Sequence, residues 1–341
     1  MRVLFAAAAW PPRVLSHGLG WRSLSSGHCS SPLSSRTALP SSPRATPHTR
    51  GLSMGGLLAA MTPLAPIGHI PASSLYVSMP DPSMFGNPAN PRPVPSSWTS
   101  PNWLRSLFHF SFAEHYDPAK SSYGVLRVLN DDTVQGDRGF GKHPHRDMEI
   151  LTYVVDGGLS HADSAGNKET LPRGSIQYMS AGRGIVHSEA NGATDAPLRF
   201  LQLWITPRVR GLAPNYGSRR VAAAERADRW VHLAADADVA ECAPGVGIAP
   251  RCDGSDLAAR LHQDANIYAA ELSPGFALPL TVHPDRQVYL VQVEGGLTVA
   301  GATKEVRLAA HDAATLQQPG MFTVTAGGGK AHLLAVEMAR A

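Results

Sequence analysis

The segment HPHRDMEILTYVVDGGL, residues 143–159, recurs later in the chain as HPDRQVYLVQVEGGL, residues 283–297. In both copies a His-Pro pair precedes an apolar run, and an acidic residue, two glycines and a leucine follow that run. Short apolar runs that end at a turn signal are typical of buried β-strands. The recurrence therefore predicts two copies of one β unit in this chain.

Other short runs rich in β-branched and aromatic residues, each bounded by turn residues, occur along the chain. We expect strands at Tyr123–Leu129, Glu149–Val155, Ser175–Met179, Leu198–Ile205, Ile267–Leu272, Gln287–Val293, Leu297–Val299 and Leu333–Val336. The sequences NDD (130–132), DGG (156–158), SAGN (164–167) and PRG (172–174) supply turn residues between them. Many short strands separated by turns indicate an all-β sandwich or barrel.

Two pairs of potential metal ligands are each spaced two residues apart. His143 and His145 lie in HPHRD, and His187 and Glu189 lie in VHSEA (186–190). Because strand side chains alternate between faces, the members of each pair point the same way, about 7 Å apart at Cα. Two such strands side by side would bring four ligands to one point. Imidazole and carboxylate without thiolate favour a divalent transition metal (Fe(II), Mn, Ni, Cu or Zn) with open positions, over a structural zinc site.

The second copy of the repeat differs at these positions. Asp285 replaces the second histidine of the pair, and no His-x-Glu follows it. His311 and His332 each stand alone, as do His109 and His161 in the first half. A single histidine in a β protein is usually not a ligand. We therefore predict that the second half keeps the architecture and has lost the site.

The charge is distributed unevenly along the 341 residues. The first 80 residues hold six of the 30 basic residues and no acid, which leaves 24 basic against 27 acidic residues after them. A body with a net charge of −3 lacks the electrostatic footprint of a nucleic-acid-binding protein. The length allows one long or two ordinary domains.

The N-terminal segment has the composition of a targeting sequence. Residues 1–50 contain ten serines and six arginines and no acid, which is typical of a chloroplast or mitochondrial transit peptide. A disordered tail, or a secretory signal at Val3–Trp10, are the alternatives; without targeting, the protein would be cytoplasmic or nuclear. The apolar stretch Gly51–Ile67 is too interrupted by glycine and proline to span a membrane. We expect an extension at 1–80 and a Pro-rich linker at 81–101.

Three segments, residues 108–134, 139–191 and 198–207, resemble the pirin family, the two-domain branch of the cupins. The resemblance runs from about Trp103 to the C terminus, and it is strong as far as Pro207. It implies two cupin β-barrels in tandem, which we expect at 102–215 and 216–341. It also implies metal ligands at His143, His145, His187 and Glu189, with iron, as Fe(II), as the usual metal.

Glu149 is a second candidate carboxylate. Most cupins take their carboxylate ligand from the first motif, four residues after its second histidine, and Glu149 occupies that place. It also shares strand parity with His143 and His145. The pirin resemblance favours Glu189 as the ligand, with Glu149 beside it.

The resemblance further implies flavonol dioxygenase (quercetin 2,3-dioxygenase) activity, with a small phenolic substrate and O2 as partners. Glu189 or Glu149 would then remove the proton of the flavonol 3-hydroxyl. Candidate pocket walls are Met148, Tyr153, Tyr178, Met179 and Trp204. A metal-dependent regulatory cupin that acts as a transcriptional co-regulator is the alternative, although the acidic body and the predicted targeting segment disfavour it. A cupin that binds a sugar or small metabolite without turnover is a third possibility.

Overall fold

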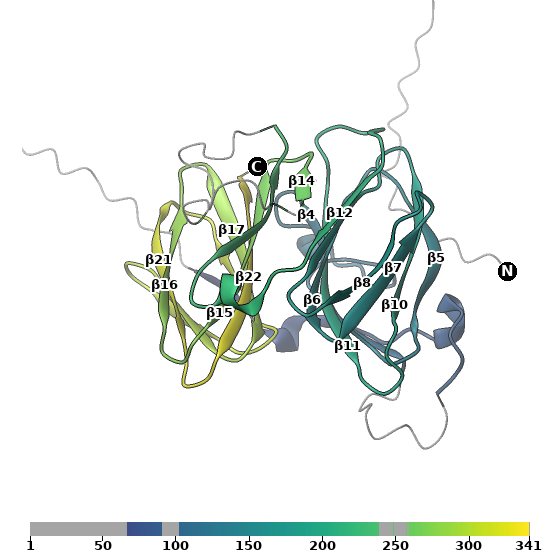
Figure 1. Ribbon diagram of the computed structural model, residues 1–341. Coiled ribbons are helices and arrows are strands. Elements are labelled where there is room, and N and C mark those ends of the chain that lie inside the picture. The colour runs from purple at the N-terminus through teal and green to yellow at the C-terminus, as the bar shows by residue number, and fades with distance from the viewer. Residues whose placement is uncertain (1–66, 91–101, 239–247, 249–256, 258, 341) are drawn as a thin grey trace, which may run out of the picture. The chain divides into compact units, whose positions relative to one another are not determined.

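The residues that the structure describes form four β-sheets, one seven-stranded and one four-stranded sheet for each copy of the repeat (Figure 1). The computed structural model describes residues 67–90, 102–238, 248, 257 and 259–340. Helices in these residues are short: η1 (Ala72–Ser74), η2 (Pro82–Phe85), η3 (Pro118–Lys120) and α1 (Ala223–Arg226). Over the same ranges, none has the length and apolar character needed to cross a membrane.

The first barrel is the pair of sheets that contains the segment 143–159. Its seven-stranded sheet has the order β12 (Asn215–Arg219), β9 (Ile176–Ser180), β6 (Glu149–Asp156), β11 (Leu198–Ile205), β4 (Leu126–Val134), β3 (Leu104–Phe108) and β2 (Tyr76–Ser78). Its four-stranded sheet has the order β5 (Gly139–His145), β10 (Ile185–Asn191), β7 (Gly158–Asp163) and β8 (Lys168–Pro172).

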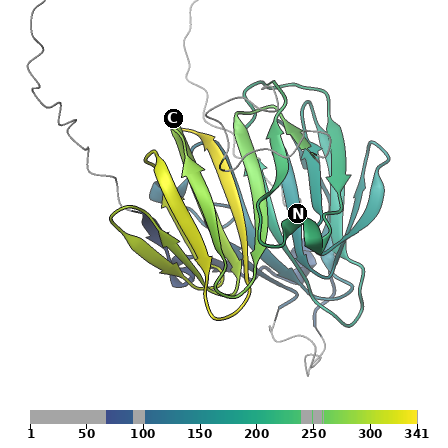
Figure 2. The ribbon, with the colours of Figure 1, turned by 60° about the vertical axis from the view of Figure 1, so that its left-hand side comes forward.

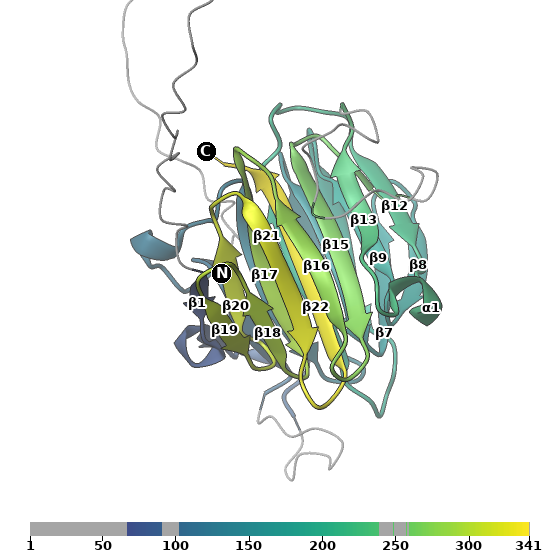
Figure 3. The same ribbon diagram turned by 90° about the vertical axis from the view of Figure 1, so that its left-hand side faces the viewer.

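The second barrel repeats this arrangement position by position. Its larger sheet has the order β1 (Gly68–Ile70), β20 (Ala313–Leu316), β17 (Arg286–Glu294), β22 (Ala331–Ala339), β15 (Ala265–Leu272), β13 (Val231–Asp236) and β14 (Ala259–Leu261). Its smaller sheet has the order β16 (Ala277–Val282), β21 (Gly320–Ala326), β18 (Leu297–Ala300) and β19 (Glu305–Leu308). The C-terminal strand β22 lies between β17 and β15 (Figures 2 and 3). Because β6 and β17 carry the two repeat copies and hold the same place, the predicted duplication is confirmed.

Most of the predicted strands are present, and the main error concerns the sequence NDD. Residues 130–132 lie inside β4 and are buried, where we expected a turn. Asp131 accepts two hydrogen bonds from Arg199, at 2.8 and 2.7 Å, and lies 2.7 Å from the ring of His311 in the second barrel. Asp132 accepts a hydrogen bond from Ser106. Polar residues that are typical of turns can occupy a buried strand when other elements supply such partners.

The two faces of the larger sheet in the first barrel belong to different cores. Along β6, Leu151 and Tyr153 belong to a cluster that also contains Ile267 and Val336 of the second barrel. The alternate residues of β6 face the interior of the first barrel, where Val154 packs with other aliphatic and aromatic side chains. The near-continuous apolar sequence of β6 follows from burial on both faces.

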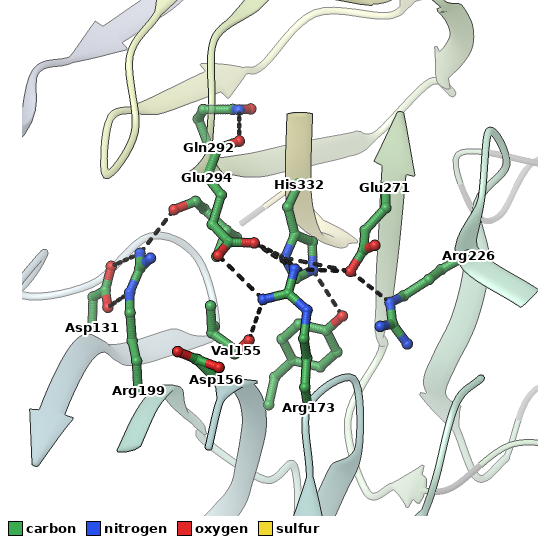
Figure 4. A network of polar contacts seen from close by, with 12 residues as sticks. Asp131, Val155, Asp156, Arg173, Arg199, Arg226, Glu271, Gln292, Glu294 and His332 are labelled. Atoms are coloured by element: carbon green, nitrogen blue, oxygen red, sulfur yellow. Dashed lines mark hydrogen bonds and ion pairs between the residues drawn. The ribbon is translucent and has the colours of Figure 1, made fainter. Parts of the chain in front are cut away.

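Charged side chains also join the two barrels (Figure 4). Arg173, from the turn after β8, lies 2.6 Å from a carboxylate oxygen of Glu294 and 3.1 Å from one of Glu271. His332 lies 3.0 Å from Glu294 through Nδ1 and 2.9 Å from the Tyr153 hydroxyl through Nε2. The hydrogen bond from His332, opposed by burial and reinforced by Arg173, lowers the pKa of Glu294 to about 2. Glu294 therefore stays ionised at neutral pH.

The N-terminal boundary of the folded chain is earlier than we expected. Strand β1 pairs with β20 at the edge of the second barrel (Figure 3), and β2 pairs with β3 of the first barrel. Asp312 holds this segment through bonds to the amide of Ala72 (2.7 Å) and the ring of His69 (3.0 Å). The prediction of an extension over residues 1–80 is thus wrong for 67–80, because short edge strands have little pattern of their own.

The end of the first barrel and the expected linker also differ from the predicted bounds. The expected boundary at 215/216 falls inside β12, which pairs with β9, so the first barrel extends to Arg219. The expected linker at 81–101 begins with the short helix η2 (Pro82–Phe85). Its later part, residues 91–101, lies outside the described residues. The transit peptide is also outside them, so targeting stays a prediction.

A chain cut to residues 81–341 should be less stable than one that spans 63–341. The shorter chain lacks β1 and β2 and exposes the contacts of Ile67 and Leu75, which are 2% and 7% exposed. Each fully buried aliphatic side chain contributes roughly 1.5–3 kcal/mol. Urea unfolding of both chains measures the difference, and equal midpoints would contradict the assignment of this segment to the fold.

Candidate metal centre

Three imidazoles meet between β5 and β10, as the spacing predicted. The two strands pair antiparallel, with His187 opposite His143 and Ile185 opposite His145. The Nε2 atoms of His143 and His187 are 3.0 Å apart, and the ring of His145 lies 4.8 Å from each of the other two rings. One potential ligand atom from each residue lies within 4.8 Å of the others. His187 is buried and the other two are half-buried, so the cluster has one side towards solvent.

The hydrogen bonds and burial of these three rings suit the binding of a metal cation. Nδ1 of His143 lies 2.7 Å from the carbonyl of Gly141, and a carbonyl only accepts, so Nδ1 is the donor in this contact while Nε2 faces His187. Nδ1 of His187 is buried without a hydrogen-bond partner among the described residues. Burial, reinforced by the neighbouring histidines, lowers the pKa of His145 to about 3 and that of His187 further. Neutral imidazoles with converging lone pairs are the form that binds metals.

Glu189 supplies a buried carboxylate next to His187. A bulge between His187 and Glu189 shifts the pairing so that Glu189 lies opposite Phe140. Its two oxygens accept hydrogen bonds from Thr152 Oγ1 at 3.0 Å and Gln202 Nε2 at 2.8 Å, which fix its orientation. In this structure Glu189 forms a group within 4.8 Å with His187 and His161, and not with His143 and His145. His187 therefore belongs to both groups.

His161 is the residue that sequence reasoning underrated. It lies on β7 directly opposite Glu189 and is 1% exposed. Its Nδ1 lies 3.1 Å from Gln177 Nε2, and its Nε2 lies 3.3 Å from Asp163 Oδ2. Because both ring nitrogens already have protein partners, His161 is less suited to bind a metal than the three clustered histidines, although it lies within reach of His187 and Glu189. Its isolation in the sequence hid it, since its neighbour in space comes from another strand.

Glu149 does not reach the cluster, so of the two candidate carboxylates only Glu189, which the resemblance favours, lies beside these histidines. Its carboxylate accepts hydrogen bonds from Tyr178 (2.6 Å), Ser180 (2.7 Å) and the backbone amide of His262 (3.3 Å). Strand β5 ends at His145, and Asp147 then adopts a left-handed conformation with φ of 51°. This turn breaks the alternation on which the parity argument depended. Thr152 of β6 bonds Glu189, so Glu149, three residues earlier, faces the opposite side.

Of the other candidate residues, some lie beside the histidine cluster and some lie away from it. Tyr153 and Tyr178 pack in the core shared with the second barrel, so they do not line the site. Met179 packs with Ile185, and Met148 and Trp204 lie against the same cluster. The Trp204 ring is 4.9 Å from that of His145. His109 lies elsewhere, with its Nδ1 2.9 Å from the Tyr289 hydroxyl.

A further buried acid, Asp132, lies in the interior of the first barrel. Burial raises its pKa to about 7; the hydrogen bond from Ser106 opposes this shift, and the charges of Asp131 and Glu189 add to it. We had assigned this residue to a turn. Its carboxyl group is neutral below about pH 7 and so limits the negative charge near Glu189.

The equivalent strands of the second barrel offer no such ligands. The residues of β16 and β21 that point inward are Leu278, Leu280, Val282, Phe322 and Val324, all buried. His283 and Asp285 follow β16 in a turn, where Asp285 has a φ of 60°. Within the described ranges, both groups of potential ligands lie in the first barrel.

Comparison with known proteins gives a family match in each of the two barrels. Residues 92–205 match the family model described as Pirin, and residues 250–338 match the quercetinase C-terminal cupin domain. A pirin-like protein of Caulobacter vibrioides is 38% identical over 66% of this chain and 88% of its own length. A protein of Escherichia coli K12 named quercetin 2,3-dioxygenase is 38% identical over 58% of this chain and 78% of its own.

Among solved structures, the bacterial pirin YhhW from Escherichia coli in complex with nickel(II) matches with a TM-score of 0.63 and 29% identity. That match covers 81% of this chain and the whole of YhhW. Two family models that account for both barrels, and relatives that are matched over most of their own length, lead to one conclusion: the chain is a member of the pirin family.

Proposed function

We propose that this protein is a metal-dependent dioxygenase that cleaves a flavonol or a related phenol with O2, and that its metal is Fe(II). The observation that carries the proposal is a cluster of three imidazoles with one buried carboxylate next to His187, open to solvent on the side of His143 and His145. The name of the Escherichia coli relative supports the reaction. The nickel(II) complex of YhhW supports a divalent transition metal as the bound ion.

The four residues His143, His145, His187 and Glu189 would hold the metal, which supplies Lewis-acid polarisation and electron transfer to O2. Thr152 and Gln202 keep the Glu189 carboxylate in one orientation. Glu189 is then placed to accept the proton of the phenolic hydroxyl.

The apolar residues around the site serve a different purpose. Met148, Met179 and Trp204 pack around the strand that carries His187 and exclude water from one side of the substrate. Trp204 also presents an aromatic surface next to His145, on which a planar phenol can stack.

The test uses the full chain, stripped of metal and reloaded separately with Fe(II), Mn, Ni, Cu or Zn. We expect quercetin-dependent O2 uptake, with matching loss of the quercetin absorbance, in at least the Fe(II)-loaded protein and none in the stripped protein. If quercetin binds but no metal supports O2 uptake, the enzyme proposal is wrong and a non-catalytic binding role replaces it.

A further inference from the structure

Three loops meet next to the histidine cluster and define what we call the mouth: residues 146–148, 181–184 and 209–212. The amide of Asp147 donates to the carbonyl of Gly182 at 2.9 Å, and the amide of Arg183 donates to the carbonyl of Leu212 at 2.8 Å. The amide of Gly211 donates to the Asp147 carboxylate at 2.7 Å. The first loop begins directly after His145, and the second ends directly before Ile185, its partner across the strands.

Each loop of the mouth presents an arginine to solvent. Arg146, Arg183 and Arg210 are exposed, and none forms an ion pair with a residue that the structure describes. Arg146 instead donates to the backbone carbonyl of Arg183 at 3.3 Å. The acid in these loops, Asp147, already accepts the amide of Gly211. The mouth arginines therefore carry positive charge that their own loops leave largely uncompensated.

Apolar surface accompanies these charges. Val209, next to Arg210, is 52% exposed. Trp204 packs against Phe112 and His145, with ring centroids 5.2 and 4.9 Å away. The indole nitrogen of Trp204 is buried without an acceptor among the described residues. A buried indole N–H usually has a partner, so this donor is free for a group that enters the mouth.

We propose that the mouth selects an aromatic substrate that carries an anionic group apart from the hydroxyl directed at the histidine cluster. The exposed Val209 and the Trp204 ring suit a flat ring, and arginine guanidinium groups bind sulfonate or carboxylate oxygens and stack on aromatic faces. Positive charge around an opening also raises the local concentration of an anion and its association rate. The substrate class is therefore a sulfonated or carboxylated phenol in preference to a neutral one. This inference rests on the proposed function for the role of the cluster, but binding tests it without turnover.

The experiment compares two ligands, quercetin and quercetin 5′-sulfonate, by calorimetric titration of the full metal-free chain under argon. We expect the sulfonate to bind roughly tenfold more tightly at low salt, a preference that shrinks as salt screens the charges. The double variant Arg146→Gln/Arg183→Gln, which leaves Arg210 in place, should lose most of the preference, whereas Arg146→Lys/Arg183→Lys should retain most of it. Arg307→Gln, which removes an exposed charge from β19 of the second barrel, is the matched control and should change nothing.

Equal affinity for the two ligands, or a preference that survives undiminished in the glutamine double variant, would overturn the inference. O2 uptake is measured on the same variants to separate this result from the proposed function. A sulfonate preference without turnover would refute only the dioxygenase. Turnover without any preference would refute only the selective mouth.

Discussion

Replacing His187 by alanine should remove nearly all bound metal while both barrels remain folded. His187 belongs to both groups of potential ligands and lies opposite His143 on the neighbouring strand, so its loss dismantles every arrangement of ligands in the described residues. The loss should exceed the roughly 10- to 100-fold effect on affinity expected when only a supporting residue is removed. Metal content by mass spectrometry and thermal unfolding measure the two outcomes. Stoichiometric metal in His143→Ala/His187→Ala would refute the site.

The matched control for this prediction comes from the second copy of the repeat. His283→Ala and Asp285→Ala alter the residues that correspond in sequence to the first His pair, but they lie in a turn beyond β16. We expect metal content and O2 uptake to match those of the unaltered chain. Loss of half of the metal would show that the second barrel holds a site as well.

Glu189→Gln should reduce turnover by roughly 10²–10⁴, the range expected when a general base is removed, even with metal in excess. The amide keeps the shape of the side chain but removes the charge that both binds a cation and accepts a proton. Metal affinity should therefore fall in the same variant. Metal content and O2 uptake on the same samples separate the two effects, because excess metal restores loading and leaves the turnover defect.

Glu149→Gln should behave differently, since its carboxylate is engaged by Tyr178, Ser180 and the amide of His262. We expect unchanged metal content and a loss of stability of about 1–3 kcal/mol from disturbed buried hydrogen bonds. If Glu149→Gln removes the bound metal while Glu189→Gln keeps it, then Glu149 and not Glu189 is the carboxylate ligand.

The contrast between these two glutamates shows how far sequence reasoning extends. Alternation within one strand is a local property, so the spacing of His143 with His145 predicted a shared face correctly. The comparison of His145 with Glu149 failed because the left-handed residue Asp147 intervenes between two strands. His161 was hidden for a related reason, because its position opposite Glu189 depends on strand pairing.

Long-range partners account for the other errors. Residues 130–132 have the composition of a turn. In the buried strand, Asp131 is hydrogen-bonded to Arg199 and to His311 of the second barrel, and Asp132 is hydrogen-bonded to Ser106. Residues 68–70 have too few side chains to show a pattern, and β20 of the second barrel makes them a strand. Neither partner can be inferred from the local sequence.

The pairing of β1 with β20 also determines when, during synthesis, β1 can join its sheet. At a synthesis rate of about 5–20 residues per second, the roughly 240 residues between Ile70 and Ala313 take about 12–50 s to produce. Strand β12, by contrast, follows its partner β9 by about 35 residues and meets it within roughly 2–7 s. The first barrel can thus complete this edge during synthesis, whereas β1 can pair only after β20, which is made long after it.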